Sequence, residues 1–342
     1  MEQNNYKYKI MIGVGGIGAG SFFLLNGNHT IGREESRSGR FLNKNDYCKL
    51  HIISHYVKIL LGTQFKVLPI GKVGDDEIGR KLLNEMNDID LFMDYVEVDK
   101  NNQTLYSFCF LYPDLSGGNM TTDNSASSSV DPEFVSKAEK EFAKHKGEGI
   151  ALAVPEAPID ARLRLLELAA KYNFFSVASL TSEEISKSEN LKFLEKVNLL
   201  CINLEEAASL LKINSTNLDA EQIVKSVSWS LSSVNPNLLI SVSNGKEGSY
   251  LWDGKEILYK PSLNVNVVST AGAGDAFTSG LIAGITKGFT LSESQDLATL
   301  VGAFSVTSPH TINKQLNKKS LIDLVQTNHL NLSNNILNFL QD

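Results

Sequence analysis

From about residue 132 onward, short apolar segments alternate with segments of helical periodicity, and this alternation is the feature that most constrains the fold. The apolar segments have the length of strands and lie at residues 149–154, 174–178, 199–202 and 238–242. The helical segments lie at residues 159–172, 185–196 and 275–286. Two parallel strands need a crossover between them, and that crossover is usually a helix. We therefore predict an α/β fold with a central, mostly parallel sheet that is flanked by helices.

The first third of the chain adds strands that do not fit this alternation. Residues 21–25 are typical of a strand that runs into a hairpin turn at residues 26–27, and residues 93–98 and 104–112 alternate as two strands of a hairpin do. We expect these strands to form a small β lid over the sheet edge, from about residues 15–40 and 92–122. The other predicted elements here are strands at residues 7–14 and 66–70 and helices at residues 46–61 and 75–87.

Composition and charge exclude several classes of partner. The chain has 342 residues, of which 42% are hydrophobic, so it can bury the core of one large α/β domain or of one domain plus an accessory piece. Its net charge of −7 argues against nucleic-acid and anionic-membrane partners, because both require a basic face. Cys48, Cys109 and Cys201 are far apart and show neither a disulfide framework nor a zinc spacing, which favours a reducing cytoplasm. No apolar run approaches about 18 residues and the first residues lack a basic-then-apolar pattern, so we expect neither membrane insertion nor secretion.

Residues 266–281 carry the strongest indication of chemistry. Gly272, Ala273 and Gly274 directly precede Asp275, at the expected first turn of a helix. Small residues let backbone amides approach a ligand, and a helix N-terminus favours negative charge. Asp275 is then either an ordinary acidic residue stabilised by the helix dipole, or a base that takes a proton from a hydroxyl while the amides hold a phosphate. The residues alone leave both interpretations open.

Residues 269–277, Ser-Thr-Ala-Gly-Ala-Gly-Asp-Ala-Phe, resemble the C-terminal signature of the ribokinase-like (PfkB) carbohydrate kinases. Three further segments resemble motifs of this family in the same order along the chain: Gly-Lys-Val-Gly-Asp-Asp-Glu-Ile-Gly-Arg at 71–80, Asn-Leu-Glu-Glu at 203–206, and Ser-Asn-Gly-Lys-Glu-Gly at 243–248. Weaker similarity runs from the first strand to about residue 313.

The resemblance implies a ribokinase-like kinase domain at residues 1–313, which includes the lid. Residues 314–342 are rich in Asn and Leu, and we expect them to form a helical surface tail packed on that domain. The strands of the lid leave edges that need to be covered, so we expect the lid to pair with a second subunit in a homodimer.

The resemblance also implies an ATP-dependent transfer of the γ-phosphate to a hydroxyl of a sugar or sugar-like molecule. Asp275 is then the catalytic base, and the amides of Gly272, Ala273 and Gly274 stabilise charge on the transferred group. Mg²⁺ bridges the phosphates with Asn203 and Glu206 around it, although this Asn and Glu also fit an ordinary helix-capping pattern. The nucleotide-binding positions implied by the resemblance are Asn203, Ser243, Gly245, Gly248, Thr270 and Asn313.

The part of the chain expected to bind the acceptor departs from the family pattern. Family members usually carry an acidic residue just after the first strand, and a Gly-Gly…Asn segment at the start of the first long helix. Residues 15–20 contain no acid, and residues 48–53 lack that segment. Gly16, Lys49 and His51 fall at the substrate positions instead, and Lys49 fits either a charged substrate or an ordinary solvated helix residue.

A further departure concerns a monovalent cation. Ser269 replaces the aspartate with which many sugar kinases bind such an ion, so we expect no strong activation by potassium.

Two other motifs suggest different chemistry. Residues 13–18, Gly-Val-Gly-Gly-Ile-Gly, satisfy a dinucleotide fingerprint, but that motif must open a helix, and residues 19–30 are typical of a strand and turn. His51 and His55 have the spacing of a zinc site without its glutamate, so we expect a partly exposed helical face there. A nicotinamide-dependent oxidoreductase, a nucleoside kinase of the same family and a catalytically weak nucleotide- or sugar-binding protein stay open as alternatives.

Overall fold

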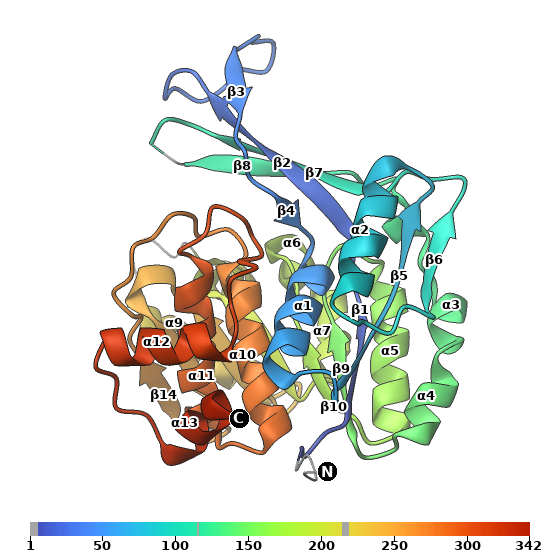
Figure 1. The fold of residues 1–342 in the computed structure, drawn as a ribbon. Helices are drawn as coiled ribbons and strands as arrows, with labels where there is room; N and C mark the ends of the chain where they lie inside the picture. Colours follow the sequence, from blue (N-terminus) through green and yellow to red (C-terminus); the bar gives the residue numbers. More distant parts are fainter. Residues whose placement is uncertain (1–5, 115, 214–218) are drawn as a thin grey trace.

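A nine-stranded sheet forms the centre of the molecule (Figure 1). The computed structural model describes residues 6–114, 116–213 and 219–342, and its main sheet has the strand order β14-β13-β12-β11-β10-β9-β1-β5-β6. All neighbours from β12 to β6 pair in parallel, and β13 and β14 add an antiparallel edge, so the predicted mostly parallel sheet is confirmed. The strands are β1 (Ile10–Val14), β5 (Lys66–Gly74), β6 (Val96–Asp99), β9 (Gly149–Ala153), β10 (Phe175–Ala178), β11 (Leu199–Asn203), β12 (Leu239–Ser243), β13 (Ser249–Trp252) and β14 (Ile257–Lys260).

Helices cover both faces of this sheet. Successive side chains of a strand point to opposite faces, so Met11 belongs to one core cluster while Ile10 and Ile12 belong to the other. The first face is covered by α1 (Lys49–Leu61), α2 (Glu77–Asp88), α10 (Ala273–Lys287), α11 (Leu291–Ser305), α12 (Lys318–Thr327) and α13 (Asn334–Gln341). The second face is covered by α3 (Pro132–Ser136), α4 (Glu139–Lys144), α5 (Ile159–Lys171), α6 (Ser182–Ser186), α7 (Leu191–Leu194), α8 (Leu204–Leu211) and α9 (Ala220–Ser232).

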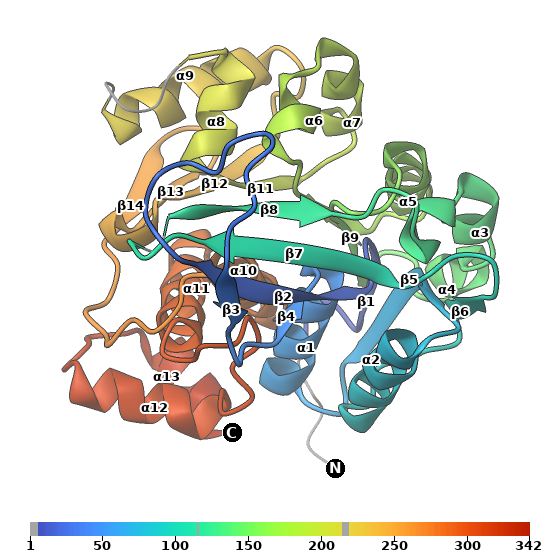
Figure 2. The same ribbon diagram turned by 90° about the horizontal axis from the view of Figure 1, so that it is seen from above.

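A second, five-stranded sheet projects above the carboxyl end of β1 and forms the lid (Figures 1 and 2). Phe23, Phe41 and Phe108 pack their rings together on it. The homodimer expected through this sheet stays a prediction. The lid strands are β2 (Gly18–Leu25), β3 (Gly39–Phe41), β4 (Asp46–Tyr47), β7 (Leu105–Leu111) and β8 (Gly117–Thr121).

The pairing of the lid strands corrects two predictions. β6 and β7 do not form a hairpin: β6 pairs in parallel with β5 in the main sheet, and β7 pairs in parallel with β2. Residues 26–27 do not form a tight turn either, because β2 reaches its partner β3 only through residues 26–38. Period-2 alternation identifies a strand but carries no information about its partner.

Other segments differ from their predicted boundaries. The helix predicted at residues 46–61 is preceded by β4, and α1 begins at Lys49. The helix predicted at 185–196 is two short helices, α6 and α7. Residues 18–25 form β2 and not the helix that a dinucleotide fingerprint must open, which removes the structural basis of the oxidoreductase alternative.

The C-terminal tail is part of the core. Leu321 of α12 and Ile336 and Phe339 of α13 are fully buried in the same cluster as α10 and α11. Residues 314–342 therefore contribute to the stability of the domain.

The two histidines of α1 are buried, so the predicted exposed face is wrong. His51 is 1% exposed and His55 is 7% exposed, and the His51 ring contacts the edge of the Tyr47 ring. Glu85 of α2 and Lys314 are the charged groups that act on these rings. Burial lowers the pKa of His51 to about 3 and that of His55 to about 4, so both rings are neutral in the folded chain.

We expect His51→Leu to reduce the loss of stability in mild acid. The folded-state pKa of His51 lies below its unfolded value, so its stabilising contribution is complete above the unfolded pKa of about 6.5 and falls as the pH drops. Between about pH 6 and pH 4, the free energy of unfolding of the wild type should fall by about 1.4 kcal/mol per pH unit relative to the variant. Urea denaturation at several pH values measures this difference, and parallel curves for the two proteins would contradict the buried, neutral state of His51.

Candidate active site

The N-terminus of α10 lies at the carboxyl edge of the main sheet and carries the acidic residue singled out from the sequence. Gly272 precedes the helix with a left-handed φ of 78°, and Asp275 lies in the first turn. The first amides of a helix have no intrahelical acceptor. The amide of Ala273 donates to the Thr270 carbonyl at 3.2 Å, so it is committed to the turn, and the amide of Gly274 is the better placed of the two for an anion.

Gly272 and Gly274 are required for different reasons. A Cβ atom at Gly272 would lie 2.7 Å from the Thr311 carbonyl oxygen, so this glycine permits both the positive φ and the close packing of the loop behind it. A Cβ atom at Gly274 would have as its nearest contact Ser243 Oγ at 4.0 Å, and Gly274 lines a cavity. The space in front of Gly274 is therefore available to a ligand.

Asp275 is paired with Lys49, the first residue of α1. Lys49 Nζ lies 3.3 Å from Asp275 Oδ1, and their side chains are 33% and 15% exposed. The negative charge of Asp275 is the main reason why the pKa of the Lys49 ammonium group is raised above its usual range. Lys49 is therefore not the solvated helix residue that the sequence allowed.

Two acids that were not predicted lie beside this pair. Glu156 follows β9, has a left-handed φ of 73°, and accepts a hydrogen bond from the Lys49 amide at 3.3 Å. Burial raises its pKa to about 7. Asp46 of β4 accepts a hydrogen bond from Cys109 Sγ of the lid strand β7 at 3.7 Å, and burial raises its pKa to about 6.

The predicted position Gly16 lies against Glu156. A Cβ atom at Gly16 would approach Glu156 Cβ to 2.4 Å, so this glycine makes room for the acid. Glu156 comes two residues after the apolar strand predicted at residues 149–154, and a search for polar residues at the carboxyl ends of parallel strands would have found it. Asp46 has no comparable signal, because it was assigned to the start of a helix.

Asn203 and Glu206 form a reciprocal capping box at the start of α8. Asn203 Oδ1 accepts from the Glu206 amide and Glu206 Oε2 accepts from the Asn203 amide, both at 2.8 Å. Burial raises the pKa of Glu206. Glu206 also lines a cavity of about 60 Å³ that reaches Lys49 and Asp275, so the capping interpretation is correct and leaves its second carboxylate oxygen for a ligand.

A larger cavity of about 400 Å³ opens in front of α10. Its walls include apolar side chains between the loop after β14 and helices α10 and α11, such as Leu263 and Val306. The predicted nucleotide-binding residues on its wall are Asn203, Ser243, Gly245, Gly248 and Thr270, together with Gly272, Ala273, Gly274 and Asp275.

Two predicted residues lie elsewhere. The Asn313 side chain is buried and donates to the Phe304 carbonyl at 3.1 Å, and Asn313 lines a separate cavity of about 340 Å³ behind the loop. His51 is buried on α1, where it contacts Tyr47. Neither position supports direct contact with a ligand in the 400 Å³ cavity.

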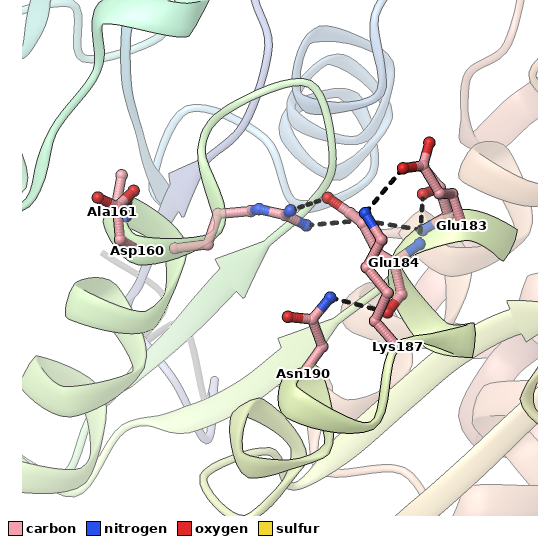
Figure 3. Close-up of polar contacts among 8 residues, drawn as sticks. Asp160, Ala161, Glu183, Glu184, Lys187 and Asn190 are labelled. Atoms are coloured by element: carbon pink, nitrogen blue, oxygen red, sulfur yellow. Dashed lines mark hydrogen bonds and ion pairs between the residues drawn. The ribbon is translucent and has the colours of Figure 1, made fainter.

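A buried ion pair holds the turn after β10 that borders the small cavity. Arg162 of α5 is fully buried and donates to both carboxylate oxygens of Glu184 in α6. The backbone carbonyl of Glu184 also accepts a hydrogen bond of 2.8 Å from Asn190 Nδ2, and this contact is drawn in Figure 3. Glu184 completes the capping box of α6 with Thr181, so this turn is fixed by several polar contacts.

The chain matches the family described as pfkB family carbohydrate kinase over residues 57–318. It is 26% identical to a ribokinase of Lactococcus lactis subsp. lactis over 251 residues, which are 70% of this chain and 73% of that protein. A second match, to an ATP-dependent 6-phosphofructokinase of Thermoanaerobacterium thermosaccharolyticum, is 40% identical over 68 residues. It spans only 20% of this chain and 21% of that protein.

Solved structures share the same fold. A ribokinase of Giardia lamblia superposes with a TM-score of 0.77 at 16% identity, covering 94% of this chain and 99% of that chain. A nucleoside kinase of Burkholderia thailandensis in complex with inosine superposes with a TM-score of 0.73 at 16% identity, covering 93% and 98%. None of the helices in the described ranges combines the length and hydropathy needed to cross a bilayer.

We expect Gly272→Ala to affect mainly the stability of the fold and Gly274→Ala to affect mainly ligand binding. Gly272→Ala should destabilise the fold by about 1–3 kcal/mol, because it combines a positive φ with a steric clash. Gly274→Ala should leave the melting temperature unchanged or higher, because alanine favours a helix, and should weaken ATP binding by at least ~10-fold. Thermal unfolding and titration calorimetry measure the two effects. Equal loss of stability in both variants, with normal ATP binding by Gly274→Ala, would show that the space at Gly274 serves packing and not a ligand.

Proposed function

The chain belongs to the pfkB family of carbohydrate kinases, and we propose that it transfers the γ-phosphate of ATP to a hydroxyl of a sugar or sugar-like small molecule. The observation that carries this proposal is the position of Asp275. This carboxylate lies at a helix N-terminus between a cavity with apolar walls and the acids Glu156 and Glu206. Phosphoryl transfer to a hydroxyl requires a base and an anion-binding helix end. It also requires one space for the nucleotide and another for the acceptor, on either side of the base.

Asp275 acts as the base in this proposal. It takes the proton of the acceptor hydroxyl as that oxygen forms its bond to the γ-phosphorus, and the electron pair of the broken P–O bond leaves with ADP. The α10 amides, with Gly274 nearest the anion, stabilise charge on the transferred group. The apolar wall formed by Leu263 and Val306 contacts the base of the nucleotide.

The donor set fits a magnesium ion held chiefly by phosphates and water. Mg²⁺ keeps several waters and uses one or two protein carboxylates, and Glu206 offers one carboxylate oxygen outside its capping bond. Among the residues with described positions, no cluster of three or more His, Cys, Asp or Glu side chains forms a metal cage. When bound, a magnesium ion would neutralise charge on the phosphates of the nucleotide, and Glu206 and Asn203 would orient its water ligands.

The acceptor side of the site is formed by Glu156 and by the lid, whose strand β4 carries Asp46. Carboxylates accept hydrogen bonds from hydroxyl groups, so these two acids take the place of the missing acid after the first strand. Their positions suit the hydroxyls of either a free sugar or the ribose of a nucleoside, and both acceptor classes belong in a test. Closure of the lid, within which Cys109 of β7 donates a hydrogen bond to Asp46 of β4, excludes water as a competing acceptor.

We expect Asp275→Asn to abolish turnover while preserving nucleotide binding. Asparagine has nearly the same shape but cannot take the acceptor proton, so kcat should fall by at least ~10²-fold. ADP release and ATP titration calorimetry measure the two quantities. Asp296→Asn, which breaks the ion pair between Asp296 of α11 and Lys260 of β14, is the matched control and should keep wild-type kcat. Comparable turnover in Asp275→Asn would remove Asp275 from the role of base and contradict the proposal.

A further inference from the structure

Lys49 is a cation surrounded by the acids of the site. Its ammonium group pairs with Asp275, and the charges of Glu156 and Glu206 also act on it. It lines both the 400 Å³ cavity and the 60 Å³ cavity, so it stands where the nucleotide space meets the space next to Glu206. A phosphoryl group that moves from the nucleotide to an acceptor hydroxyl beside Asp275 therefore comes close to the Lys49 ammonium group.

The location of Lys49 on its helix is unfavourable for stability alone. Lys49 is the first residue of α1, and the positive end of a helix dipole repels a cation there. The N-cap residue Cys48 makes no side-chain capping bond, and the first turn of α1 contains no acid. Glu156, from the distant turn after β9, supplies the missing acceptor to the Lys49 amide. A lysine that stands against this local preference and whose amide is bound by a partly buried acid indicates a functional constraint.

We propose that Lys49 is a catalytic residue that stabilises the negative charge on the phosphoryl group during its transfer, and that Glu156 positions it. This inference rests on the proposed kinase function. Before reaction the ammonium group neutralises Asp275. As Asp275 takes the hydroxyl proton, its charge disappears, and the ammonium group is released toward the oxygens of the phosphoryl group and the departing ADP. Lys49 stays protonated throughout, so the only proton that moves is the one from the acceptor to Asp275.

The alternative is a purely structural ion pair between α1 and α10. Both side chains are partly exposed, and ion pairs of this kind contribute little to stability. A structural role therefore predicts a small change in melting temperature and little change in kcat. A catalytic role predicts that removal of one charge-stabilising group lowers kcat by ~10²- to 10³-fold with little change in binding.

Lys49→Met distinguishes the catalytic role of Lys49 from a purely structural one, because it keeps the length of the side chain and removes its charge. Lys225→Met is the matched control: it breaks a lysine–glutamate ion pair with Glu221 on the exposed side of α9. We expect Lys49→Met to lower kcat by ~10²- to 10³-fold, with the KM of the acceptor and the Kd of ATP changed less than ~3-fold. Lys225→Met should match the wild type in all three quantities.

Rescue of kcat by added amines provides a second test, because a purely structural role of Lys49 predicts no such rescue. In Lys49→Ala, added methylammonium or ethylammonium ions should restore part of kcat in a saturable manner, and they should not rescue Asp275→Asn. Normal kcat in Lys49→Met, or a loss confined to KM and melting temperature without amine rescue, would overturn the role of Lys49 and leave the kinase proposal intact. A wild-type protein that transfers phosphate to no acceptor would overturn both.

Discussion

The parallel register of the central sheet determines where the functional groups of this chain can lie. Strands β1, β9, β11 and β12 run in the same direction, so the residues that follow them emerge at one edge. Gly16, Glu156, Asn203 and Ser243 come from segments far apart in the sequence, yet each lies at or just beyond such a strand end. α10 presents its N-terminus and Asp275 at the same edge, so the amides and the base meet these groups without any long loop.

Electrostatics at this edge are balanced by one lysine. Glu156, Glu206 and Asp46 are partly buried, and this loss of solvent raises their pKa values, so their negative charges are costly where they stand. Lys49 offsets part of that cost and pairs with the one acid of the first turn of α10. The pairing of Lys49 with these acids lowers the energetic cost of the folded site. It also places a positive charge and several negative charges at the position where phosphate would be transferred.

The sequence predicted the main sheet and the helix that carries Asp275, because their hydrophobic periodicity and small-residue motif are local signals. It predicted the existence of the lid strands but not their pairing, since alternation does not identify a partner. The burial of His51 was missed because His51 and His55 lie on one face of α1 at the spacing of a polar stripe, whereas the fold buries α1 on nearly every side, including that stripe. Glu156 and Asp46 were missed because their importance depends on contacts between segments that only the tertiary structure brings together.

The measurement that tests the central claim most directly is phosphate ester formation in pooled acceptors. The wild-type protein is incubated with Mg-ATP and pools of sugars, sugar phosphates, sugar acids and nucleosides, and products are read by mass spectrometry, with Asp275→Asn alongside. The account predicts a new phosphate ester of one acceptor class, formed in step with ADP and absent with Asp275→Asn. ATP binding without any phosphorylated acceptor across all pools, or an equal yield from Asp275→Asn, would contradict it.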